Sequence, residues 1–469
     1  MKDTQDFRTG ILECKNGNAS FYEKDFNFCI TSNVISPKKF YEAPDMYSLV
    51  QENQFLKGTT HSGQHIEIYT GNSNIHPLPS CSPFQIHTSM YLIQSSNTIG
   101  ISDWNAFDGI RFEGGTLNNL FSYHNVSTKY FPGGCTITDS DYNLSGSIET
   151  SYGKVDIRIG WFTQHTAKPN KMIVNQNTGY IDLTFDKPIS RQEAFENIEN
   201  VRTLLSFMCY RKNVDFDSIY LQKKHTQETS ETPTSEFYND AQVFIQYDFS
   251  PTRKRPLDSI CFDELGKNVF DLFEMIYDRK QSNPFHFLDF IPNSDESAKW
   301  ISGEMIRDVA TFIECEYHRA SQKKDSKAKK LFEDSERLKN LKLKLRQVLS
   351  QDESENTPFP KSTHNNIENN INKIAFSSCN TDFALYEAYK DITQFIISTP
   401  SPLKALSESD TSEFRKYRNG KSHGRHMALN TNIGITTLYL IASGYCSILH
   451  RAKVDDSILK KLCEKHFLV

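Results

Sequence analysis

The stretch SRQEAFENIENVRTLLSFM, residues 190–208, separates two halves of the chain that have different sequence patterns. Ser190 and Glu193 have the spacing of a capping box, in which each side chain bonds to the backbone N–H group of the other residue. Apolar residues then recur every three or four positions, which is typical of an amphipathic helix: Ala194, Ile198, Val201, Leu205 and Met208. We therefore expect one helix here, packed on the element that precedes it.

The half of the chain before this helix has the pattern of β-strands. Residues 153–162 (GKVDIRIGWF) alternate apolar and polar side chains. Residues 171–185 contain two apolar runs around NQNTG, which predicts a hairpin with a glycine in its turn. Loops rich in Gly, Pro, Asn and Ser connect such segments. The sequence therefore predicts an antiparallel β-domain, a sandwich or a barrel-like sheet, over residues 1–224, closed by the helix.

The half after the helix is first polar and then helical. Residues 225–256 contain prolines and polar residues around one short apolar run, so we expect an inter-domain linker there that can include one strand. Residues 257–469 have apolar residues at helical spacing, most clearly in three stretches, 263–280, 295–320 and 382–398. Residues 430–452 are apolar on nearly every side, which predicts the central helix of an all-α bundle. The expected fold class is α+β, with a β-rich domain before a helical one.

Charge, cysteine content and hydropathy exclude several classes of protein. The net charge of −5 gives no overall basic field, so any nucleic-acid site has to be a local patch. The ten cysteines form no C-x-x-C pair, which argues against a zinc site and is typical of thiols in a reducing cytosol. The chain has neither an apolar leader nor a run of about 18 apolar residues, so we expect a cytoplasmic protein with no membrane segment.

One local basic patch stands out near the end of the chain. Residues 413–426 (EFRKYRNGKSHGRH) contain five Lys or Arg, two His and two Gly. An ordinary exposed helix includes acidic residues and avoids glycine, which costs about 1 kcal/mol per helical position. Within the patch, Arg418, Asn419 and His423 form the string R-N-x-x-x-H-G. These three residues are our candidate catalytic group.

Their side-chain types suit cleavage of RNA without a metal or a cofactor. Histidine titrates near neutral pH, so His423 can take the proton of a ribose 2′-hydroxyl. The guanidinium of Arg418 binds phosphate oxygens and stays charged, so it can hold the phosphate as negative charge builds up. Residues four apart share a helix face, so we expect Asn419 to orient the imidazole. The other cations would attract the phosphate backbone of the substrate: Arg415, Lys421 and Arg425.

The motif and its context resemble those of HEPN-domain ribonucleases, whose signature is R-x4-6-H with a polar residue after the arginine. A helical lead precedes the motif here, and the most apolar helix follows it. The order of the two domains is similar to that of the ApeA-type anti-phage proteins of bacteria. The resemblance implies an HEPN bundle, a homodimer with a composite cleft, and RNA products with 2′,3′-cyclic phosphate and 5′-hydroxyl ends. It also implies abortive infection, triggered when a phage protein reaches the β-domain. Gly420, inside the motif, departs from the pattern.

Two other functions remain open at this point. The basic patch could dock RNA, DNA or a nucleotide without cutting it, in a non-catalytic interaction protein of two domains. Nucleotidyl or phosphate transfer with the same Arg and His is weaker, because the chain lacks a Gly-rich phosphate loop and a carboxylate pair.

Several other residues carry expectations of their own. Residues 323–346 contain ten basic and four acidic residues and leucines at near-heptad spacing. This pattern predicts an exposed helix with one packed leucine stripe, or an arm that contacts phosphate or bridges two copies. We expect Asp308 and Glu314 to face solvent, outside the site. We expect the tryptophans to be core residues: Trp104, Trp161 and Trp300.

Overall fold

The structure is a computed structural model that divides into two compact units. Unit 1 comprises Met1–Ser206, Lys212–Pro256 and Cys261–Phe270, and unit 2 comprises Phe207–Arg211, Leu257–Ile260 and Asp271–Val469. The residues that it describes are 8–14, 17–32, 55–71, 74–76, 84–95, 104–121, 126–131, 134–139, 143–168, 171–227, 234–247, 259–278, 283–322, 326–352, 358–374, 406–424 and 427–466. Unit 1 is rich in β-strands and unit 2 is helical, so the α+β class with this order of parts is confirmed.

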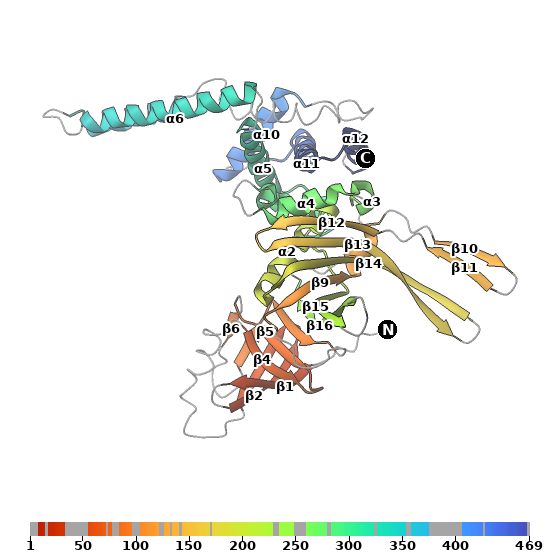
Figure 1. Ribbon diagram of the computed structural model, residues 1–469. Helices are drawn as coiled ribbons and strands as arrows, with labels where there is room; N and C mark the ends of the chain where they lie inside the picture. The colour runs from red at the N-terminus through yellow and green to blue at the C-terminus, as the bar shows by residue number, and fades with distance from the viewer. Residues whose placement is uncertain are drawn as a thin grey trace, which may run out of the picture. The chain divides into compact units, whose positions relative to one another are not determined.

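Within the described residues of unit 1, fourteen strands form one antiparallel sheet (Figure 1). Their bounds are Arg8–Cys14 (β1), Gly17–Lys24 (β2), Asn27–Ser32 (β3), Phe55–Thr60 (β4), His65–Tyr69 (β5), Asn74–His76 (β6), Phe84–His87 (β7), Met90–Gln94 (β8), Phe107–Glu113 (β9), Asn143–Thr150 (β12), Gly153–Lys168 (β13), Lys171–Ile189 (β14), Ser218–Gln227 (β15) and Thr234–Ile245 (β16). Their order across the sheet is β12-β13-β14-β9-β15-β16-β8-β5-β4-β1-β2-β3-β7-β6. Two further strands pair with each other in a separate ladder, Val126–Phe131 (β10) and Gly134–Asp139 (β11).

Alternating polarity explains the strands, as β13 illustrates. The charged residues Lys154, Asp156 and Arg158 are exposed, and the apolar residues that alternate with them are buried, which confirms the pattern expected over residues 153–162: Val155, Ile157, Ile159 and Trp161. The hairpin turn expected at NQNTG is wrong. Strand β14 continues through that segment, and the chain reverses between Lys168 and Lys171, which are paired. The ladder with β13 bonds the backbone there, and an irregularity between Thr163 and His165 adjusts the register.

The segment 225–256, expected to be a linker that can include one strand, contains strand β16. Strand β16 pairs with β15 on one side and with β8 on the other, so it lies inside the sheet. Its short apolar run has Ala241, Val243 and Ile245 buried at every second position. A half-buried strand needs only this alternation, and the polar residues between make the segment resemble a linker. Unit 1 includes this segment as part of Lys212–Pro256.

The helix expected at residues 190–208 is confirmed as α2, Arg191–Cys209. Glu193 accepts a bond from the backbone N–H of Ser190 and donates its own N–H to the Ser190 hydroxyl, which completes the capping box. The ring of Phe195 lies 5.6 Å from that of Phe55 and 5.5 Å from that of Tyr69, so α2 packs on β4 and β5. The five apolar residues of its stripe are all buried: Ala194, Ile198, Val201, Leu205 and Met208.

The remaining α-helices of the described residues follow α2 in the chain, and the described residues contain nine α-helices in all. They are Phe262–Leu265 (α3), Asn268–Tyr277 (α4), Gly303–Gln322 (α5), Ser326–Asp352 (α6), Lys361–Lys373 (α7), Glu408–Ser422 (α10), Thr431–Arg451 (α11) and Asp456–His466 (α12), with short 3-10 helices at Gly115–Asn119, Pro284–Phe290 and Ser297–Lys299. The stretch 263–280 is two helices rather than one, because Gly266 adopts a φ of 54° that ends α3. The helix expected over 382–398 lies outside the described residues.

Helix α11 contacts α5, α10 and α12, which confirms the central position expected for residues 430–452. Tyr445 stacks on Phe207 with ring centroids 4.4 Å apart, and its hydroxyl donates a 2.8 Å hydrogen bond to the Phe207 carbonyl. Burial raises the pKa of Tyr445 well above its usual range. Among the described residues, α11 is the one helix long and apolar enough to cross a membrane. Because 72% of its apolar window is buried, it has the character of a core helix in a soluble protein.

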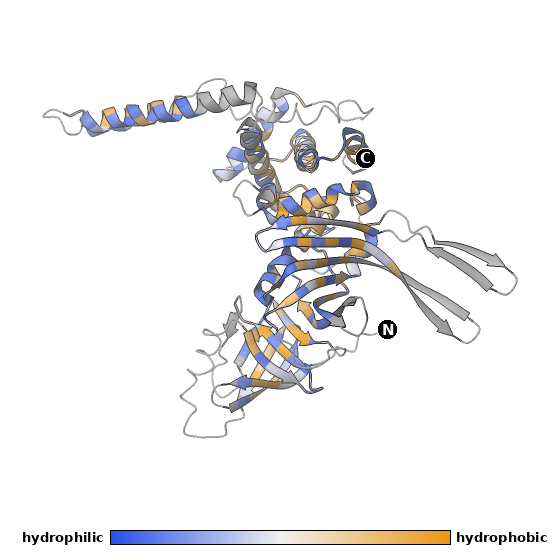
Figure 2. Ribbon diagram, viewed as in Figure 1, coloured by the Kyte–Doolittle hydropathy of each residue, from blue (hydrophilic) through white to orange (hydrophobic). Residues whose placement is uncertain are grey.

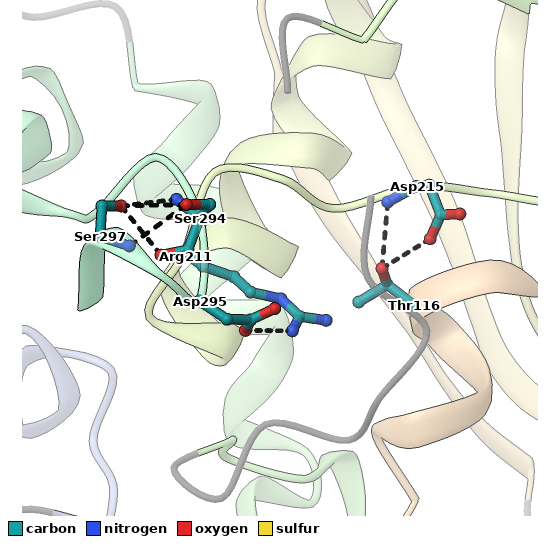
Figure 3. Close-up of polar contacts among 6 residues, drawn as sticks. All are labelled: Thr116, Arg211, Asp215, Ser294, Asp295 and Ser297. Carbon is teal, nitrogen blue, oxygen red and sulfur yellow. Dashed lines mark hydrogen bonds and ion pairs between the residues drawn. The ribbon is translucent and has the colours of Figure 1, made fainter. Parts of the chain in front are cut away.

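Buried polar contacts hold two loops in place, one in each unit (Figure 3). In unit 2 the almost fully buried Arg211 forms a 2.5 Å ion pair with Asp295. Ser294 and Ser297 close a turn there, and the Ser297 hydroxyl accepts a 2.8 Å bond from the Ser294 N–H. The ion pair of Arg211 with Asp295 fixes the segment that leads into α5. In unit 1 the Thr116 hydroxyl donates to the Asp215 carboxylate at 2.9 Å and accepts from the Asp215 N–H at 3.0 Å.

Candidate functional site

The candidate catalytic residues lie at the C-terminal end of α10 in unit 2. The helix begins with a capping box, in which the Ser407 hydroxyl accepts from the Asp410 N–H and the Asp410 carboxylate accepts from the Ser407 N–H. Phe414 and Tyr417 are buried, and α10 contacts both α5 and α11. Because one face of α10 is fixed in this way, the position of each residue in its last two turns is set by helix geometry.

Arg418 is held by two oxygen acceptors. Its guanidinium donates one bond to the side-chain oxygen of Asn419 at 3.1 Å and another to the carboxylate of Glu314 on α5 at 3.3 Å. The Arg418 side chain is 25% exposed and that of Glu314 is 28% exposed, so solvent still reaches both groups. Asn419 therefore bonds to the arginine, and not to the imidazole as we expected. The neighbouring guanidinium is a charged donor, and charge-assisted bonds are the stronger ones.

His423 is the exposed residue that caps the end of α10. Its backbone N–H donates to the Asn419 carbonyl at 3.1 Å, and the next N–H, of Gly424, donates to the Lys421 carbonyl at 3.0 Å. Gly424 has a φ of 70°, the left-handed conformation that commonly ends a helix and that glycine adopts without strain. Within the described residues the imidazole makes no hydrogen bond, so it is open to a substrate.

The two key side chains do not meet within one chain. Helix α10 is continuous from Arg418 to Ser422, and five residues correspond to a rotation of about 140° around a helix axis. Arg418 is directed to α5, while His423 lies beyond the end of the helix. Among the described residues, no contact joins their side chains. The structure therefore brings Arg418 together with Asn419, and among the described residues neither of these side chains hydrogen-bonds to the imidazole.

Gly420 has a packing reason to be in the motif. It is buried, and a Cβ at this position would overlap the sulfur of Met427, which folds back onto the helix after the turn. The turn is also fixed at its far side by Asn430. The Asn430 side chain accepts the Ile433 N–H at 2.8 Å, which caps α11, and donates to the Glu413 carboxylate at 2.7 Å. These contacts define how the chain leaves α10 and enters α11.

The predicted substrate-binding cations differ in their surroundings. Lys421 is exposed, and its ammonium lies 5.8 Å from the centre of the Tyr417 ring, within the range of a cation–π contact. Arg415 is half-buried on α10. Arg425 lies outside the described residues.

Sequence reasoning missed Glu314, which we expected to face solvent. It follows the buried Ile313 and comes four residues after the buried Ala310, so it lies at the border of the apolar face of α5. An acid at such a border is placed to reach a cation on a neighbouring helix, and this was the available signal. Asp308 bonds instead to the side chain of the adjacent Arg307 at 3.2 Å.

Exposed apolar side chains occur on three segments of unit 2: before α5, in the turn between α10 and α11, and on α11. Trp104 and Trp161 are buried as expected, but Trp300 is 71% exposed, so the core position expected for it is wrong. Arg211 and the Ser294 turn fix the segment before Trp300, and its neighbour Ile301 lies against Gly434 on α11. Leu438, one turn after Gly434, is 48% exposed and Leu429 is 44% exposed. We call Trp300, Leu429 and Leu438 the apolar patch.

The described residues contain no group of three or more His, Cys, Asp or Glu side chains that could hold a metal ion. His426, three positions after His423, lies outside the described part of the chain.

No family model, no curated protein and no solved structure matches this chain.

Proposed function

We propose that this chain is a metal-independent endoribonuclease of the HEPN type that acts in anti-phage defence in the bacterial cytoplasm. One observation carries the proposal. Arg418 is held by Asn419 and Glu314 at the end of α10, while His423 is exposed at the cap of the same helix. A fixed cation and a free imidazole are the two groups that cleavage next to a ribose requires.

The reaction uses the ribose of the substrate as the nucleophile. His423 takes the proton of the 2′-hydroxyl, the 2′-oxygen attacks phosphorus, and the bond from phosphorus to the 5′-oxygen breaks. The leaving oxygen takes a proton from water, and the hydroxide that remains takes the proton held by His423. The products are a 2′,3′-cyclic phosphate and a 5′-hydroxyl. Arg418 stabilises the extra negative charge on the phosphate oxygens during the attack. Lys421 and Arg415 attract the neighbouring phosphates.

A homodimer completes the site in this proposal. Arg418 and His423 of one chain do not meet, so a guanidinium from one copy would act with an imidazole from the other. The apolar patch supports this arrangement because it flanks the turn that carries the motif and exposes a tryptophan and two leucines to water. An isologous contact through this patch would bring two motifs to one cleft.

Unit 1 is the proposed sensor for a phage protein. It forms a separate compact unit and contributes none of the motif residues, so it is available for regulation. Binding of the phage protein to unit 1 would release or assemble the nuclease in unit 2.

The experiment is RNA cleavage in the presence of EDTA. We expect the purified wild-type protein to cut total RNA under these conditions, with 2′,3′-cyclic phosphate ends, and His423→Ala to lose at least about a hundredfold in rate. His423 is exposed, so its replacement should leave the melting temperature unchanged. Cutting that stops with the chelator, or that persists in His423→Ala, would exclude this mechanism.

A second function is favoured by one observation. The guanidinium of Arg418 already bonds to a carboxylate, as expected for a structural ion pair that supports a non-catalytic RNA-docking surface. Overexpression separates the two. Growth arrest that is abolished by His423→Ala supports the nuclease, whereas equal toxicity of the wild type and the variant supports docking alone.

A further inference from the structure

A second set of cations lies on α6, far along the chain from the motif. Residues 337–346 contain five Lys or Arg and no acid, in a chain whose net charge is −5. In Figure 1, α6 extends away from α5, α10 and α11 of the same unit. Figure 2 shows hydrophilic and hydrophobic residues alternating along its described part. The single packed stripe expected from the near-heptad spacing is wrong, because Leu338 is buried but Leu341 and Val348 are 43% and 64% exposed. The buried leucines of the described part of α6 are Leu338 and Leu349, so the cations need a separate explanation.

Three of these cations form a stripe along one face of α6. Lys339, Lys342 and Arg346 are spaced three and four residues apart, which places them within about 60° of one another around the helix. They extend over about 10 Å of the helix axis. We call them the α6 stripe.

Helix α7 orders this stripe without neutralising it. The Lys342 ammonium donates to the backbone oxygen of Asn372 at 3.0 Å, and the Arg346 guanidinium donates to the side-chain oxygen of the same residue at 2.6 Å. Both acceptors are uncharged, so both cations keep their full charge. Lys339 pairs with Glu336, but the two side chains are 68% and 42% exposed, and such surface pairs are weak.

The support beneath the stripe is a packed pair of helices. Leu338 and Leu349 of α6 are buried, as is Ile371 of α7, and the His364 ring contacts the Leu349 carbonyl at 3.3 Å. The exposed apolar residues Leu341 and Val348 lie on another face of α6, together with Arg337 and Lys344. The stripe itself contains no apolar side chain, so its chemistry matches a polyanion better than an apolar protein surface.

We propose that the α6 stripe binds the phosphate backbone of single-stranded RNA and thereby delivers the substrate to the motif on α10. The proposal rests on the proposed function, since it assigns a docking arm to that nuclease. Lys342 and Arg346 have uncharged acceptors, and Lys339 has one exposed ion pair with Glu336. Such cations attract successive phosphates, which release their counterions, so binding depends on salt but not on sequence.

The experiment measures RNA binding to the His423→Ala protein, which keeps the substrate intact. Fluorescence anisotropy with an end-labelled single-stranded RNA of mixed sequence is recorded at several salt concentrations. The test variant is Lys342→Gln/Arg346→Gln, because glutamine keeps an N–H donor for Asn372 and removes two charges. We expect binding about five- to tenfold weaker and a salt slope smaller by about 1.4, which corresponds to about 0.7 per lost phosphate contact.

The matched control is Arg337→Gln/Lys344→Gln, which removes the same charge from the other face of α6. We expect its affinity to stay within about twofold of the parent. Equal losses in the two double variants would mean that only total charge matters, which would overturn the proposal. No loss in either variant, or no RNA binding by the parent, would have the same consequence. A change in oligomeric state with unchanged RNA binding would identify the stripe as a protein interface and would also overturn it. Circular dichroism confirms that the helices persist.

The outcome of this test is independent of the outcome of the nuclease test. Stripe-dependent RNA binding without any cutting by the wild type would leave the docking arm in place and remove the nuclease. Cutting with chelator present, together with RNA binding that ignores the stripe, would leave the nuclease and remove the arm.

Discussion

Helices α10 and α6 both carry dense positive charge, but the protein holds the two sets of cations in different ways. On α10, Arg418 is half-buried and bonds to a carboxylate on another helix. On α6, Lys342 and Arg346 bond to uncharged oxygens of Asn372 and keep their charge. A cation that acts in a transition state has to be fixed in one position, whereas cations that attract a long polyanion have to be displayed. Two segments of similar composition are therefore expected to have different roles, because their cations make different contacts.

The largest expected effect concerns the fixed arginine. Arg418→Ala should lower the rate of RNA cleavage by about 10²- to 10³-fold, because the phosphate loses its charged partner as the reaction proceeds. Lys344→Ala on α6 is the control and should change kcat by less than about twofold, since Lys344 lies on the face opposite the stripe. Single-turnover kinetics with saturating enzyme give both values. Equal losses in the two variants would remove the distinction between the helices.

The next effect concerns the apolar patch beside α10. Leu438→Asp should convert a dimer into monomers and lower specific activity by at least about tenfold, because a charge in an apolar interface is not solvated. Leu343→Asp on α6 introduces the same charge at another exposed leucine, which is 53% exposed, and should leave the oligomeric state unchanged. Sedimentation velocity measures the oligomeric state of both variants. A wild-type protein that stays monomeric during cutting would contradict the composite site.

A smaller effect concerns the carboxylate that positions Arg418. Glu314→Gln keeps the shape of the side chain but weakens the ion pair, so kcat should fall by about three- to tenfold while KM changes little. The same exchange on α6, Glu336→Gln, should leave kcat unchanged. Rescue of kcat in Glu314→Asp would indicate a positioning role. A fall in melting temperature with kcat preserved would show that the pair is only structural.

The smallest effect concerns the glycine inside the motif. Gly420→Ala should favour the helix by about 1 kcal/mol from propensity alone, yet it displaces Met427 and shifts the turn that carries His423. We expect kcat to fall by about twofold without loss of stability. Asn340→Ala, at an exposed position of α6, is the control and should change neither. An unchanged kcat in Gly420→Ala would show that the Met427 contact does not set the turn.

Local patterns in the sequence predicted the regular elements well. The apolar spacing of α2 and the all-round apolar character of α11 depend on burial alone, so both helices could be predicted. For β16 the sequence allowed a strand within the expected linker but not its place inside the sheet, because one buried face in an otherwise polar segment resembles a linker until its partner strands are known.

The candidate site was only partly predictable for the same reason. The residue types follow from the sequence, but the helix end does not: we expected Asn419 and His423 to share a helix face, whereas α10 ends at Ser422. Gly424, with its φ of 70°, was the signal for this end. The contact of Arg418 with Glu314 joins residues that are 104 positions apart, and no local pattern encodes it. Trp300 is exposed on the segment that follows Asp295, and the ion pair of Asp295 with Arg211 again joins distant residues.

The central claim is that a guanidinium and an imidazole from two copies of this turn act on one RNA. Subunit mixing tests it most directly. The Arg418→Ala and His423→Ala proteins are mixed in equal amounts, and activity is measured after their subunits have exchanged. Each variant alone should be inactive, and the mixture should recover about a quarter of the wild-type rate, because half of the dimers then hold one complete pair. A mixture as inactive as its parts would contradict the account.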